Sequence, residues 1–175
     1  MAERDPDSTY ETGPLKIFYS DGTHLVERLP PKRKGGPHEI VSNQEGIEDP
    51  QVTDDGKTMG WLETFDNIGD SNYAFPFVVV IFRSGAIQRR IIPERIIWDW
   101  KFFDGGKTVG VSLGYPHGEA VADQYKLYDV NTGRLLAEAE VDAELEDLPP
   151  GAPEWAKQLE GKVAARSQDA PRCRE

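Results

Sequence analysis

The chain has one cysteine and three histidines among its 175 residues. Cys173 therefore cannot form an intramolecular disulfide, and we interpret it as an exposed thiol in a polar tail. His24, His38 and His117 are far apart in the sequence, whereas a zinc site needs three or four converging ligands. The sequence predicts neither a metal site nor a cofactor.

Long apolar runs and excess positive charge are also missing. No stretch approaches the roughly 20 apolar residues that a membrane-spanning helix needs. The formal net charge of −11 repels phosphate backbones, so nucleic acid is not an expected partner. The polar start, residues 1–10, does not have the form of a signal peptide. It is compatible with the start of a mature protein, and we favour an exported location, periplasmic or extracellular, over a cytoplasmic one.

Turn-forming residues are plentiful, since the chain contains 17 glycines and 13 prolines. This composition favours many short strands over long helices. We therefore predict an all-β fold of about ten antiparallel strands in blade-like, four-stranded units, with one short C-terminal helix. We expect a flexible leader at 1–13, a β-rich domain with propeller-like repeats at 14–148, a helix at 149–166 and a flexible tail at 167–175.

A near-repeat organises the predicted domain. Residues 54–58 (Asp-Asp-Gly-Lys-Thr) and 104–108 (Asp-Gly-Gly-Lys-Thr) each join two β-prone segments through a tight glycine turn. Each unit then passes through a polar loop into a second hairpin, with turns at Gly85 and Gly133. Four strands at a period near 50 residues are typical of a propeller blade. A further hairpin is predicted at 15–29, around an Asp-Gly turn.

Alternation assigns faces to one strand. In the segment 96–103, strict period-two alternation places Ile96, Trp98, Trp100 and Phe102 on one face, which we expect to be the core. After Pro149-Pro150-Gly151, residues 152–165 have helical potential. Trp155, Leu159 and Val163 form one apolar stripe of that helix, which predicts packing on a sheet.

The repeats resemble those of TolB-type β-propellers. Residues 55–58 (Asp-Gly-Lys-Thr) and 106–108 (Gly-Lys-Thr) match the turn before a hydrophobic strand, and residues 127–135 match the outer hairpin with its Asp-x-x-Thr-Gly turn. The resemblance covers about two and a half units over residues 15–141, whereas a closed ring has at least four blades. The open possibilities are an open stack, an oligomer that closes the ring, or a sandwich. The resemblance carries over no catalytic residues and implies protein binding.

Two polar loops contain the candidate site residues. Asp66 and Asp70 belong to a loop rich in oxygen ligands, which fits either a calcium site or a polar loop held by its own Asx turns. Tyr115, His117 and Glu119 belong to the second loop, where the histidine and glutamate form a possible acid–base pair. We name these five as binding candidates and assign no catalytic residue.

Two functions follow as expectations. The first is a non-enzymatic protein-binding or assembly module that acts on a protein partner or on itself as a homo-oligomer. The alternative is a small carboxylate-based hydrolase or carbohydrate-binding protein. For that alternative, Glu63, Asp66, Asp99 and Glu119 supply candidate carboxylates, and Asp99 is notable because it lies between two tryptophans.

Overall fold

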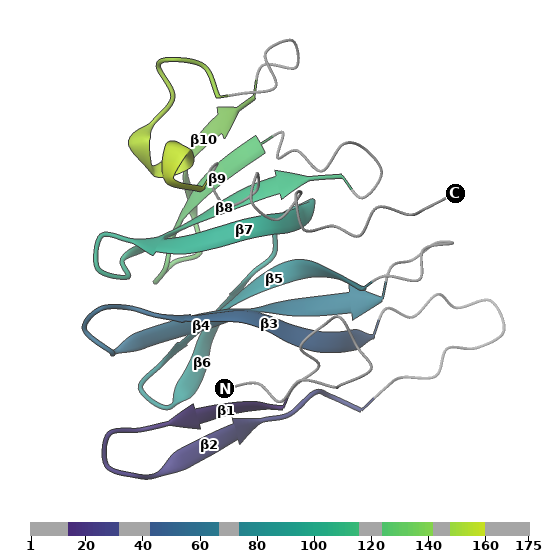
Figure 1. The fold of residues 1–175 in the computed structure, drawn as a ribbon, viewed down its shortest axis with the longest axis vertical. Coiled ribbons are helices and arrows are strands. Elements are labelled where there is room, and N and C mark those ends of the chain that lie inside the picture. Colours follow the sequence, from purple (N-terminus) through teal and green to yellow (C-terminus); the bar gives the residue numbers. More distant parts are fainter. Residues whose placement is uncertain (1–13, 32–42, 67–73, 116–123, 142–147, 160–175) are drawn as a thin grey trace, which may run out of the picture. The chain divides into compact units, whose positions relative to one another are not determined.

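The computed structural model describes residues 14–31, 43–66, 74–115, 124–141 and 148–159 (Figure 1). Within these ranges the protein is all-β, with ten antiparallel strands and one short C-terminal helix, as the composition predicts. The strands group into two compact units, one holding β1 to β6 and the other β7 to β10 with the helix. The predicted leader, the segment 32–42, the tail and Cys173 lie outside the described residues.

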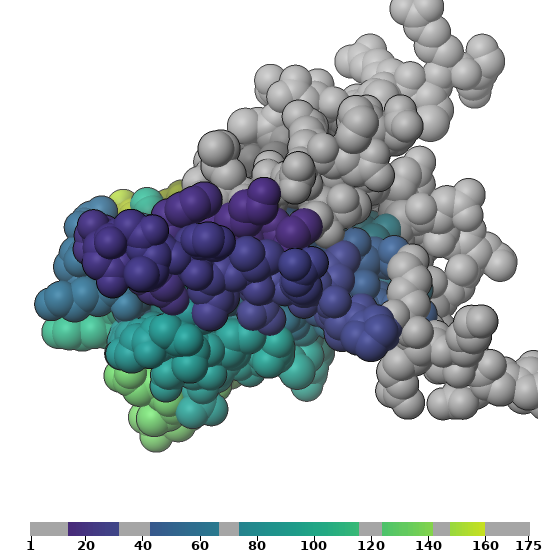
Figure 2. All heavy atoms as spheres, turned by 90° about the horizontal axis from the view of Figure 1, so that it is seen from below, coloured from purple at the N-terminus to yellow at the C-terminus, as the bar shows by residue number. Residues whose placement is uncertain are grey.

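The first unit begins with a two-stranded hairpin, β1 (Leu15–Phe18) and β2 (His24–Glu27). The Asp-Gly turn forms as predicted, with Gly22 at φ 85°. Asp21 Oδ1 accepts hydrogen bonds from the Thr23 backbone N–H and hydroxyl, at 2.9 and 2.6 Å. The hairpin shares no strand pairing with the neighbouring sheet, so it is held there by side-chain packing. Figure 2 looks onto its outer surface, in purple.

A four-stranded meander completes this unit. Its strands are β3 (Gln44–Val52), β4 (Thr58–Asp66), β5 (Ala74–Arg83) and β6 (Ala86–Ile91), in that order. Leu15 and Ile17 of the hairpin pack in one core cluster with Trp61, whose side chain is fully buried. The cluster also contains Ile47, Val78, Val80 and Phe82. The hairpin therefore covers the face of the sheet that bears Trp61.

The second unit repeats the meander. Its strands are β7 (Ile96–Phe103), β8 (Thr108–Gly114), β9 (Gln124–Asp129) and β10 (Leu135–Glu140), paired in chain order. The helical segment 154–159 packs on this sheet, because Ala156 and Leu159 are buried in a cluster with Tyr125, and Trp98 and Phe103 pack against that cluster. Of the predicted stripe, Leu159 is buried and Trp155 packs at the cluster's margin, whereas Val163 lies outside the described residues.

The predicted alternation of β7 is wrong. The register between β7 and β8 shifts between Ile97 and Asp99, so Trp98 occupies a β-bulge. Trp98 consequently packs on the helix side, whereas Trp100 packs edge-on against Phe102, with ring centroids 5.1 Å apart. One extra residue has moved the two tryptophans out of the single row that period two predicts, and Trp98 is only partly buried.

The repeated turns differ in detail. In both, a glycine N–H closes the turn, Gly56 to the Thr53 carbonyl at 2.8 Å and Gly106 to the Phe103 carbonyl at 2.9 Å. The second turn has positive φ at both central residues, Asp104 (50°) and Gly105 (63°), which is the type I′ form that suits hairpins. The first turn has Asp55 at the position of Gly105. A glycine there suits the positive φ of the second turn.

Candidate functional site

The structure does not describe a joint site for the five predicted binding residues. Asp66 ends β4, half-buried, and its backbone N–H donates to the Asn43 carbonyl at 3.0 Å. Tyr115 follows β8 and is 59% exposed. The guanidinium of Arg95 lies over its ring, 4.6 Å from the centroid. Asp70, His117 and Glu119 lie outside the described residues, as does the proposed calcium loop beyond Asp66.

The histidines and acidic residues of the described ranges do not form a metal site. No group of three or more His, Cys, Asp or Glu side chains there could hold an ion. His24 is exposed on β2, where its ring lies 5.8 Å from that of Phe18. The other two histidines fall outside these ranges. Among the described helices, none is long and apolar enough to cross a membrane.

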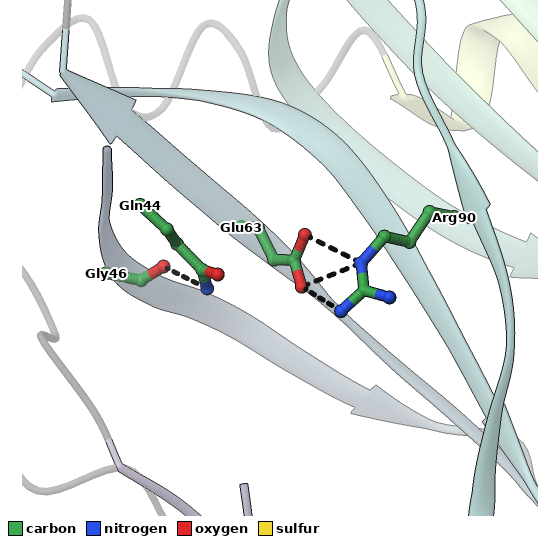
Figure 3. Close-up of polar contacts among 4 residues, drawn as sticks. All are labelled: Gln44, Gly46, Glu63 and Arg90. Carbon is green, nitrogen blue, oxygen red and sulfur yellow. Dashed lines mark hydrogen bonds and ion pairs between the residues drawn. The ribbon is translucent and has the colours of Figure 1, made fainter. Parts of the chain in front are cut away.

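Glu63 has a defined partner in the first unit. Its buried carboxylate accepts hydrogen bonds from Arg90 of β6, with Nη2 to Oε1 at 2.9 Å and Nε to both oxygens at 3.1 Å (Figure 3). The Arg90 side chain is 45% exposed. The hydrogen bond that Arg90 donates to Glu63 and, more weakly, the charges of Glu63 and Glu27 raise the pKa of Arg90, while burial opposes them. Glu63 is thus engaged as an ion-pair partner across β5.

Asp99 is the second carboxylate of the hydrolase hypothesis that the structure describes in full. It is completely buried in the second unit. The Ser112 hydroxyl donates to its backbone carbonyl at 3.4 Å. A substrate in solution does not reach a carboxylate in that position without a rearrangement of β7. Together, Glu63 and Asp99 give the hydrolase hypothesis no accessible pair of acids among the described residues.

A different surface, the outer strand of the second sheet, is exposed and apolar. Leu135 and Leu136 of β10 are 42% and 43% exposed. The β9–β10 register shifts between Leu135 and Ala137, so Leu136 occupies a bulge. β10 is the last strand of its sheet, and no other described strand pairs with its outer edge. An edge of this kind presents unpaired backbone N–H and C=O groups to a partner.

The face beside that edge is acidic. Glu138 and Glu140 are exposed on β10. Burial raises the pKa of the Tyr128 phenol on β9 to about 12, with smaller contributions from the charges of Glu94 and Glu138. Lys126 lies directly opposite Glu138 and offsets part of this negative charge. The outer part of the second sheet therefore combines leucines with glutamates.

The sequence reasoning did not single out β10 as a site. It predicted a hairpin with its turn at Gly133, and β10 begins two residues after that glycine. The available signal was the adjacent pair Leu135-Leu136. In a regular strand, neighbouring side chains point to opposite faces, so both leucines cannot enter one core.

Comparison with known proteins adds no family to this description. No protein-family model matches the chain, and no curated protein matches it at a significant level. The fold and the candidate surface therefore rest on the residues themselves.

Proposed function

We propose that the protein is a non-enzymatic binding or assembly module that contacts another protein through an open sheet edge. One observation carries the proposal: β10 ends its sheet and exposes Leu135 and Leu136. Exposed leucines on an edge with which no other described strand pairs favour strand addition by a partner, since edge strands template pairing. The resemblance of the repeats to TolB-type β-propellers supports a protein-binding role by analogy of fold alone.

The carboxylate-based hydrolase or carbohydrate-binding function has less support. Glu63 is held by Arg90 through three short contacts, and Asp99 is fully buried. General acid–base catalysis requires carboxylates within reach of the substrate. The open edge is therefore the better basis for a function.

Site-specific photo-crosslinking tests the proposal. A photoreactive amino acid replaces Leu136 in the full-length protein, which is then irradiated in an extract of its host. We expect a discrete protein adduct that mass spectrometry identifies. The matched control carries the same probe at Lys107, an exposed turn position in the same unit. Equal adducts at both positions, or none at Leu136, would contradict a role for the edge.

A further inference from the structure

The edge strands of the two sheets differ in how well they resist pairing. β3 is interrupted by Asp49, at φ 45°, and by Pro50, which lacks a backbone donor. Its register also shifts twice. β6 carries Arg89 and Arg90, and charged residues on an edge disfavour the approach of an arbitrary strand. β10 shares two of these protective features, a bulge at Leu136 and two charged residues, Glu138 and Glu140.

β10 differs from β3 and β6 in its exposed leucines and in a bulge that lies at the start of the strand. Neither proline nor glycine interrupts it, and two exposed leucines open it. Beyond the bulge, Glu138 and Glu140 share one face, and Ala137 and Ala139 share the other, paired in regular register with β9. Four consecutive residues of this edge, 137–140, thus keep an ordinary antiparallel geometry. Their backbone groups on the outer side are suitable for a fifth strand.

The negative charges on β10 favour a fifth strand with positively charged side chains. Opposite charges directly across neighbouring strands stabilise pairing, and like charges oppose it. A strand paired with β10 meets Glu138 and Glu140 on one face, where Lys126 of β9, directly opposite Glu138, offsets only part of the negative charge. On the other face, Ala139 packs against the cluster beneath the helix, so an added strand meets apolar surroundings there. The complementary sequence therefore alternates basic and apolar residues.

We infer that β10 binds an extended segment of another protein in which lysine or arginine alternates with apolar residues, adding it to the sheet as a fifth strand. This rests on the proposed function and specifies its partner. A second copy of the chain is a poor occupant, because two copies with a formal charge of −11 each repel one another. The interaction weakens as salt is added, since part of it is electrostatic.

The probe is an eight-residue peptide that alternates lysine and valine, titrated into the ¹⁵N-labelled full-length protein. We expect saturable shifts of backbone amide signals that are largest in β10. The peptide with glutamate in place of lysine serves as the charge control. A version with N-methyl groups on alternate backbone nitrogens serves as the strand-pairing control. Both are expected to bind about tenfold more weakly or not at all.

Variants of the protein complete the test. Glu138→Lys with Glu140→Lys is expected to weaken binding of the lysine peptide about tenfold and to permit binding of the glutamate peptide. Glu154→Lys, at an exposed helix position in the same unit, is expected to leave binding within about twofold, because its charge is not on the edge. Equal binding of the N-methylated peptide, or shifts spread over other strands, would overturn the inference.

Different results would contradict the protein-binding edge and the basic partner strand. Absence of peptide binding together with a crosslinked protein at Leu136 would overturn the basic partner and retain the protein-binding edge. Absence of both would overturn the edge itself. If the crosslinked protein is a second copy of this chain, the partner inferred here is wrong, and the homo-oligomeric form of the proposed function is supported.

Discussion

The two four-stranded sheets share strand order and turn chemistry, but they are covered on different faces. Thr58 and Thr108 are the equivalent first residues of β4 and β8. Trp61 follows Thr58 by three residues, and Gly110 follows Thr108 by two residues. Because neighbours alternate between faces, these residues lie on opposite faces of the repeat. The hairpin covers the Trp61 face of the first sheet, and the helix covers the Gly110 face of the second.

The difference teaches that a repeated meander does not dictate which face is covered. In the first sheet, the hairpin packs against the buried indole of Trp61 through Leu15 and Ile17. A glycine lets a helix approach: a Cβ at Gly110 would lie 2.8 Å from Phe103 Cε2 and 3.1 Å from Leu159 Cδ1. The first sheet has Gly60 at the position equivalent to Gly110, so the glycine permits a helix without requiring one, and the strong difference in volume lies at Trp61 and its equivalent, Val111.

Removal of the largest core side chain should break the first unit most severely. Trp61→Ala is expected to lower the free energy of unfolding by about 3–5 kcal/mol, through lost apolar burial and the remaining cavity. Urea denaturation followed by circular dichroism measures this. The indole N–H has no hydrogen-bond acceptor among the described residues, so Trp61→Phe should cost clearly less. Similar losses for the two variants would contradict a packing role.

The ion pair of the first sheet has no described equivalent in the second, and its removal should be felt next. Glu63→Leu is expected to cost about 2 kcal/mol, because it leaves Arg90 without its buried partner; the half-exposed arginine reaches water and so limits the loss. The double variant with Arg90→Leu should recover part of that loss in a double-mutant cycle. Strictly additive effects would show that the pair is energetically uncoupled.

The helix cover of the second sheet depends on Gly110. Gly110→Ala is expected to cost about 1 kcal/mol, because the new methyl group displaces the Phe103 ring and the Leu159 side chain. Gly151→Ala is the matched control, since its Cβ would meet nothing within 4 Å and its φ is not positive. Thermal unfolding of both variants measures the difference. A loss as large for Gly151→Ala would contradict the explanation by helix packing, because its added methyl group meets no neighbour and the lower entropy of the unfolded chain stabilises that variant.

The smallest expected effects concern the pKa values of two turn aspartates, Asp21 and Asp129. Hydrogen bonds from Thr23 lower the pKa of Asp21, the hydroxyl contributing most. Hydrogen bonds from Thr132 lower the pKa of Asp129, the backbone N–H contributing most. Thr23→Val should therefore raise the pKa of Asp21 more than Thr132→Val raises that of Asp129. A pH titration of the carboxyl carbons by nuclear magnetic resonance measures both.

The lowered pKa values of Asp21 and Asp129 determine how the stability of the fold depends on pH. A carboxyl group whose pKa is lower in the folded state contributes stability above its unfolded pKa, about 3.9 for aspartate. That contribution is lost as the pH falls through the folded value. Each valine variant should therefore unfold with a weaker dependence on pH in the acidic range. An unchanged acid dependence would contradict the assigned hydrogen bonds.

Local turn chemistry made much of the fold predictable. The Asp-Gly turn at 21–22, the Ser-Gly turn at 84–85 and the repeated glycine turns fixed strand ends within about two residues. β3 is the exception, since nothing predicted its start at Gln44. It contains Gly46, Asp49 and Pro50, residues that disfavour strands on their own. Pairing with β4 overrides those preferences, and a single sequence does not reveal that pairing.

The candidate surface was less predictable for two physical reasons. Bulges at Trp98 and Leu136 change which face a side chain meets, and they arise from pairing with a neighbour that periodicity does not contain. Edge position is also a property of the sheet: Leu135 and Leu136 read as ordinary strand residues until β10 is known to be the last strand. The loop residues chosen for their polarity carried no such information.

The most direct test compares β10 with β6, the fourth strand of each sheet in chain order. Leu136 of β10 and Gln88 of β6 occupy the same place, at the bulge of an exposed fourth strand. The photoreactive probe is placed at each position in turn, and adducts with other proteins are counted in the same host extract. The account predicts a discrete adduct at Leu136 and none at Gln88. Adducts at Gln88 alone, or at neither position, would contradict it.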